Sequence, residues 1–160
     1  MIYENEIHDE ERGFYGIKDA TIRNCKIDGP ADGESAFKEC KDIIVEDTYF
    51  NLRYPFWHDD NVKIIGCEMT EGCRAALWYD KGVEIDNCKM HGIKALRECE
   101  DISLKNTDVI SPEFAWRSRN IKINDVKVEG EYPFFECKNM VIENLHMKGK
   151  YSFQYVENVT

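Results

Sequence analysis

A repeat of 19 to 23 residues runs through the chain and limits its fold more than any other feature of the sequence. Segments such as "DATIRNCKI", "GVEIDNCKM" and "NIKINDVKV" share one pattern: a turn residue, two apolar residues alternating with polar ones, an Asn or Asp, then two more apolar or small residues. The first apolar residue of each unit is called the anchor here. The anchors are Ala20, Ile43, Val62, Val83, Ile102, Ile121, Met140 and Val159. A period of this length indicates a solenoid of stacked repeats.

Each position of the repeat predicts a local structure. The anchor and the second residue after it alternate with polar residues, as in a short strand with one buried face. The fourth residue after the anchor is Asn, Asp or Gly, which accept left-handed backbone and bend the chain. The residue before the anchor is mostly of the same kinds and marks a second bend. One unit therefore predicts strand, bend, strand, longer bend, strand.

Three short strands cannot bury a face alone, but stacked coils pair in parallel about 4.8 Å apart. The sequence therefore predicts an all-β protein, a right-handed single-stranded parallel β-helix of about eight coils. It forms a single domain over residues 1–160, with residues 1–11 as an N-terminal cap. A leucine-rich repeat is the main alternative, but it places its Asn one residue later and needs a strand rich in leucine.

A third segment precedes each anchor, and its alternation predicts which side chains point inward. The sixth position before the anchor predicts an interior stack of Phe14, Phe37, Phe56, Leu77, Leu96, Ala115, Phe134 and Phe153. The fifth position should point outward, and it holds Tyr15, Lys38, Trp57, Trp78, Arg97, Trp116, Phe135 and Gln154. All three tryptophans of the protein lie in this second column.

An exposed strip of rings and cations is typical of a ligand-binding surface, because sugars stack on rings and Arg packs between them. The predicted ligand-binding residues are Trp57, Trp78, Arg97, Trp116, Arg53 and Arg74. Arg binds carboxylates through two parallel hydrogen bonds, so a saccharide or a small acidic sugar is the predicted ligand. Two alternatives stay open: a loop or partner chain covers the strip, or the arginines pair with glutamates of neighbouring coils.

Four side chains at the edge of the strip are candidates for catalysis: Asp59, Asp80, His58 and Tyr79. The two aspartates occupy one column on neighbouring coils, and carboxylates so close should separate their pKa values and leave one proton to donate. Glycosidases use such pairs, so an enzyme here would be a glycoside hydrolase or a lyase. Three cysteines share the column, which also allows a partly buried bend where Asp only caps backbone amides.

Charge and cysteine content restrict the remaining functions. A formal net charge of -10 argues against binding to nucleic acids or anionic membranes. The apolar runs are too short for a transmembrane helix or a secretory signal, so a cytoplasmic location is expected. Seven cysteines without a compact disulfide framework fit a reduced compartment. Because there is no CxxC and no paired His, neither a metal site nor a cofactor is expected.

Several long segments carry a family resemblance: "DGPADGESAFKEC", "NLRYPFWHD", "CRAALWY", "HGIKALREC", "SPEFAW" and "GKYSFQY". They resemble the bacterial domain-of-unknown-function family 3737, which is placed among pectin-lyase-like right-handed β-helix proteins and has no assigned activity to carry over. The chain stops at "VENVT", the opening of another repeat, which indicates a truncated chain or a short family member.

Two classes of function follow from the sequence. One is a carbohydrate-binding or carbohydrate-active protein that uses the strip. The other is a non-catalytic structural or protein-interaction scaffold. An uncapped last coil leaves strand edges that invite pairing, so homo-oligomerisation is predicted with Phe153 and Tyr155 near the contact.

Overall fold

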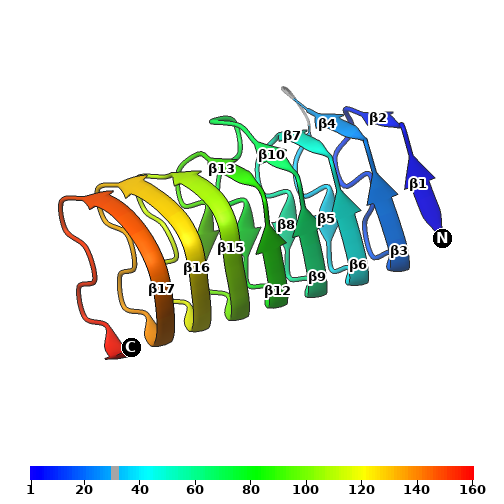
Figure 1. Cartoon of the computed structure of the whole chain (residues 1–160). Coiled ribbons are helices and arrows are strands. Elements are labelled where there is room, and N and C mark those ends of the chain that lie inside the picture. The colour runs from blue at the N-terminus through cyan, green and yellow to red at the C-terminus, as the bar shows by residue number, and fades with distance from the viewer. Residues whose placement is uncertain (30–32) are drawn as a thin grey trace.

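The computed structural model describes residues 1–29 and 33–160 and shows a β-solenoid whose coils stack along one axis (Figure 1). Its strands form three series. The first comprises β1 (Ile2–Glu4), β3 (Lys18–Arg23), β6 (Lys41–Glu46), β9 (Asp60–Ile65), β12 (Lys81–Asp86), β15 (Glu100–Ile110), β16 (Arg119–Gly130), β17 (Lys138–Gly149) and β18 (Glu157–Val159). The second comprises β2 (Ile7–His8), β4 (Lys26–Asp28), β7 (Tyr49–Asn51), β10 (Glu68–Met69) and β13 (Lys89–His91). The third comprises β5 (Phe37–Lys38), β8 (Phe56–Trp57), β11 (Leu77–Trp78) and β14 (Leu96–Arg97).

The strand pairing confirms the predicted all-β parallel solenoid of about eight coils. All pairings between these strands are parallel, and each joins equivalent positions of neighbouring coils. The anchors stack in one register, from Ala20 against Ile43 to Met140 against Val159. β15, β16 and β17 are long enough to continue from the first series into the second. No helix within the described residues is long and apolar enough to cross a membrane.

Left-handed residues make the bends, as predicted. The fourth position after the anchor has positive φ in seven coils, including Asn24, Gly66 and Asn144. The position before the anchor is also left-handed, from Asp19 to Asn158. A further left-handed bend, four residues before the anchor, was not predicted. It carries side chains such as Glu39, Tyr79, Glu98 and Arg117, whose residue types give no local sign of positive φ.

The interior stack is also confirmed. Phe56 is fully buried, and its ring lies parallel to that of Phe37 with centroids 5.2 Å apart. Phe37 in turn stacks on Phe14 at 4.9 Å. Leu77 lies in register with Phe56 on the next coil and is equally buried. Large apolar side chains therefore meet their equivalents one coil away, and this burial along the axis is the main stabilising contribution.

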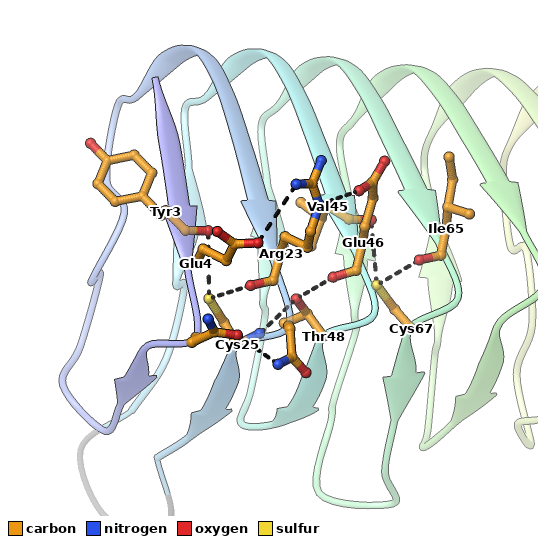
Figure 2. Close-up of polar contacts among 11 residues, drawn as sticks. Tyr3, Glu4, Arg23, Cys25, Val45, Glu46, Thr48, Ile65 and Cys67 are labelled. Carbon is orange, nitrogen blue, oxygen red and sulfur yellow. Dashed lines mark hydrogen bonds and ion pairs between the residues drawn. The ribbon is translucent and has the colours of Figure 1, made fainter.

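Each of the seven cysteines is buried and free, and its thiol bridges two coils. Figure 2 shows Cys25 and Cys67, whose Sγ atoms donate to the carbonyl oxygens of Tyr3 at 3.9 Å and Val45 at 3.5 Å. The same contact with a preceding coil recurs for Cys40, Cys73, Cys88, Cys99 and Cys137. The cysteines therefore satisfy backbone carbonyls as well as filling space.

The two ends of the solenoid differ. Residues 1–11 contribute β1 and β2, which pair with β3 and β4 and so continue the stack. The rings of Tyr3 and His8 lie 5.2 and 4.6 Å from that of Phe14 and cover the first member of the interior stack. At the other end β18 pairs with β17 only near Lys138 and Met140.

Candidate functional site

The predicted strip lies on the third series of strands, and its residues are in register. Lys38 pairs with Trp57, Trp57 with Trp78, and Trp78 with Arg97, on β5, β8, β11 and β14. An isolated bridge continues the column from Arg97 to Trp116. All five side chains are half-buried, whereas their neighbours in the interior column are buried. We call the first four of these residues, Lys38, Trp57, Trp78 and Arg97, the aromatic strip.

The rings of the aromatic strip stack on one another along the solenoid axis. Trp57 and Trp78 have centroids 5.6 Å apart and an interplanar angle of 10°. The ammonium of Lys38 lies 4.5 Å from the Trp57 ring, and the guanidinium of Arg97 lies 4.9 Å from the Trp78 ring. A cation therefore caps each outer ring face, and the surface presents indole edges.

A second pair of rings runs beside the tryptophans. His58 and Tyr79 stack at 4.9 Å and 12°, and Tyr79 is 41% exposed. Both residues have φ of 57°, because they occupy the bend that follows β8 and β11. On the other side Tyr54 packs 5.9 Å from Trp57 and 5.8 Å from Trp78. Tyr54 was missed in the sequence, although tyrosine recurs at the same position of later coils.

Trp116 differs from the other two tryptophans. It lies outside any strand, because its coil turns at left-handed Ala115. Its Nε1 donates to the carbonyl oxygen of Tyr132 at 2.6 Å, and its ring packs 4.7 Å from Phe135. The equivalent Nε1 atoms of Trp57 and Trp78 are buried without a hydrogen-bond partner among the described residues.

Most cations of this face are paired with glutamates, which was the alternative left open by the sequence. Arg53 lies 3.3 Å from Glu34, and Arg97 donates to Glu98 at 2.9 Å. The same kind of pairing joins Lys94 to Glu113 and Arg117 to Glu136. Arg74 is exposed and has no ion pair within residues 1–29 and 33–160. Lys38 is likewise without an ion pair in that part of the chain.

The two candidate catalytic carboxyl groups lie inside the solenoid. Asp59 and Asp80 are each 2% exposed. Asp59 Oδ1 accepts from the backbone N–H of Cys40 at 2.8 Å, and Asp80 Oδ1 accepts from that of Asp59 at 2.7 Å. These are the amide-capping contacts that the sequence left as an alternative. The catalytic assignment of Asp59, Asp80, His58 and Tyr79 stays a prediction, and only His58 and Tyr79 reach the surface.

Burial controls the protonation of both aspartates. Desolvation raises the pKa of Asp59 to about 8. Desolvation, together with the neighbouring carboxylate of Asp59, raises the pKa of Asp80 well above its ordinary value. The second oxygen of each group has no hydrogen-bond partner among the described residues, which fits a protonated acid better than a carboxylate.

Together the coils and this column define a β-solenoid with an outward strip of stacked rings and cations. The chain belongs to the family described as "Protein of unknown function (DUF3737)", whose model matches residues 1–160. No curated protein matches the sequence. Among solved structures it is similar to the plasmid-mediated fluoroquinolone resistance protein QnrB1, at 12% identity and a TM-score of 0.35, over 100% of this chain and 91% of the other. That likeness carries no argument about function, and the pectin-lyase-like relationship stays a prediction.

Proposed function

We propose that this chain is a non-catalytic saccharide-binding solenoid whose aromatic strip takes an acidic saccharide. The observation that carries the proposal is the register of the strip, which sets a cation at each end of a stacked tryptophan pair. Arg53 and the exposed Arg74 lie on the same coils as these rings and add positive charge.

The orientation of the rings favours an anionic ligand over a neutral one. Aromatic rings carry negative charge on their faces and positive charge at their edges. The faces of Trp57 and Trp78 are covered by one another and by the two cations, so a ligand meets ring edges. Ring edges and cations both attract a carboxylate or phosphate, which is the group that distinguishes an acidic sugar.

The non-catalytic part of the proposal rests on the burial of Asp59 and Asp80. A general acid or base must come within hydrogen-bond reach of the reacting group. Both carboxyl groups are enclosed by the coil, and each already accepts a backbone amide. Their raised pKa values follow from the same burial and need no catalytic role.

Tryptophan fluorescence tests the proposal, because all three tryptophans lie in the predicted column. Tetramers of hexuronic acids should change the indole emission of the wild type, and neutral hexose tetramers should not. Arg97→Gln should weaken the binding of the acidic probes by at least about tenfold, since it removes one capping cation. The control is Arg23→Gln, which removes an arginine that pairs with Glu46 on another face (Figure 2). No response to any acidic probe, or equal losses in the two variants, would refute the proposal.

A specific observation favours a second candidate, a scaffold without a small ligand. The tryptophan faces are occupied within the protein, and the Nε1 atoms of Trp57 and Trp78 are enclosed. In a scaffold the aromatic strip would only stabilise the packing of neighbouring coils. Trp78→Ala would then lower stability, while the wild-type emission stays unchanged by acidic and neutral probes alike.

A further inference from the structure

A groove of about 560 Å³ lies on the outer surface of the first series of strands, away from the aromatic strip. One wall is the column of residues that precede the anchors, at the bend into β9, β12, β15, β16 and β17: Asn61, Gly82, Asp101, Asn120 and Asn139. The other wall is the column that follows the anchors: Lys63, Glu84, Ser103, Lys122 and Val141. This volume lies in the range of small-molecule sites.

The first wall is a chain of side-chain hydrogen bonds between neighbouring coils. Asn61 Nδ2 donates to Asp42 Oδ1 at 2.6 Å, and Asn120 Nδ2 donates to Asp101 Oδ1 at 2.9 Å. Asn139 and Asn158 continue it with donations of 3.0 and 2.9 Å to the preceding coil. The chain is interrupted at one coil, where the residue is Gly82.

The interruption leaves a notch that presents hydrogen-bond acceptors from both sides. The Asn61 amide nitrogen is used toward Asp42, so its oxygen is left for the notch. Asp101 on the far side is a carboxylate with one oxygen beyond the one that Asn120 contacts. A Cβ at Gly82 would meet nothing nearer than 3.5 Å, so the notch has room for added atoms.

We infer that this groove is a second saccharide site, and that one neutral sugar unit occupies the notch at Gly82. Adjacent hydroxyl groups of a sugar would donate to the oxygens of Asn61 and Asp101, and so replace the missing side chain of the hydrogen-bonded wall. An acidic sugar is disfavoured at the notch, because its carboxylate would face Asp101, and the neighbouring Lys63 is already paired with Glu84 at 4.0 Å. The inference goes beyond the proposed function, since it concerns another face and the opposite preference for ligand charge.

Gly82→Asn fills the notch without a change of fold. Gly82 has φ of +72°, a left-handed conformation that Asn accepts more readily than other side chains. Asn is the residue at the same position of four other coils. The new side chain should extend the wall and exclude a sugar, and the melting temperature should stay level or rise because the unfolded chain loses freedom.

Titrations with neutral hexose tetramers of glucose, mannose and galactose test the inference by calorimetry. The wild type should bind at least one of them, and Gly82→Asn should weaken that binding by at least about tenfold. The matched control is Gly16→Asn, which places Asn at another left-handed bend where an added Cβ has no atom within 4 Å. No binding by the wild type, or equal binding by wild type and Gly82→Asn, would overturn the inference.

Nuclear magnetic resonance separates this site from the aromatic strip. Neutral tetramers should shift the Gly82 backbone amide and the Asn61 side-chain amide and leave the indole signals of Trp57 and Trp78 in place. Arg97→Gln should not alter these shifts. Neutral binding that moves the indoles and not Gly82 would overturn the groove assignment. Loss of acidic binding at the strip alone would count only against the proposed function.

Discussion

The protein should lose stability as the pH rises, because two aspartates are buried in protonated form. Burial raises the folded-state pKa of Asp59 to about 8, from an ordinary value of 3.8. The folded protein therefore holds a proton that the unfolded chain releases. When the native state binds more protons, the free energy of unfolding falls with increasing pH. The favourable contribution is complete below the unfolded pKa and is lost as the pH rises toward the folded pKa.

The size of the effect follows from this window. Each pH unit between the unfolded and folded pKa values costs about 1.4 kcal/mol for one group. Both pH 5 and pH 7 lie inside the window of Asp59, so the contribution of Asp59 to the free energy of unfolding changes by roughly 2–3 kcal/mol between them. Asp59→Asn keeps the oxygen that accepts from Cys40 and removes the proton. From pH 5 to pH 7 the free energy of unfolding should therefore fall less in the variant than in the wild type. The difference between the two should be about equal to the contribution of Asp59.

Urea unfolding at the two pH values measures the difference directly. Titrating groups away from the Asp59–Asp80 pair cancel between variant and wild type, whereas Asp80 responds to the loss of the neighbouring Asp59 carboxyl group and is part of the measured difference. Asp60→Asn is the control, since Asp60 is the next residue and is exposed. It should keep the pH dependence of the wild type. If Asp59→Asn and the wild type differ by less than about 1 kcal/mol in their pH dependence, Asp59 is not a buried acid and the burial argument fails.

Further expectations concern packing, the aromatic strip and assembly. Phe56→Ala should cost about 3–5 kcal/mol in denaturant melts because Phe56 is fully buried. Phe56→Leu should cost less, since the same column accepts Leu77; a loss under about 1 kcal/mol for the alanine variant would contradict the interior stack. Trp78→Ala should cost at least about 1–2.5 kcal/mol, the sum for its stacking on Trp57 and its contact with Arg97, since Tyr54 and Tyr79 also pack against this ring. A loss near zero would show that the stack does not form in solution. Light scattering should detect concentration-dependent self-association that Phe153→Ser and Tyr155→Ser reduce, and a monomer at all concentrations would argue against it.

The solenoid could be predicted from the sequence because its constraints are periodic. Each interior residue contacts its own equivalents, so a column such as Phe14, Phe37 and Phe56 repeats the same requirement in successive coils. Asn and Asp indicate two of the bends, because these residue types accept left-handed backbone. The bend four residues before the anchor could not be found in this way, because residues such as Glu39, Tyr79 and Arg117 do not prefer left-handed backbone.

The strip was predictable in its position but not in its geometry. Alternation along β8 and β11 was enough to turn Trp57 and Trp78 away from the interior. Their stacking along the axis depends on side-chain torsions and on the caps from Lys38 and Arg97, which residue spacing does not specify. The notch at Gly82 could not be predicted either, because glycine is common at bends and the side-chain hydrogen bonds of Asn61, Asn120 and Asn139 are visible only in the structure.

The thiols that bridge successive coils can also report which coils open during unfolding. Each sulfur is shielded only while its coil lies against the preceding one, and the seven are spread from Cys25 to Cys137 along the axis. An alkylating reagent added at a low urea concentration would therefore mark the coils that open first. Mass spectrometry of the labelled peptides would then give the order in which the coils separate, with no engineered probe. Opening that begins at the β17 end would label Cys137 before Cys67 and Cys88, and cooperative opening would label all seven at one rate.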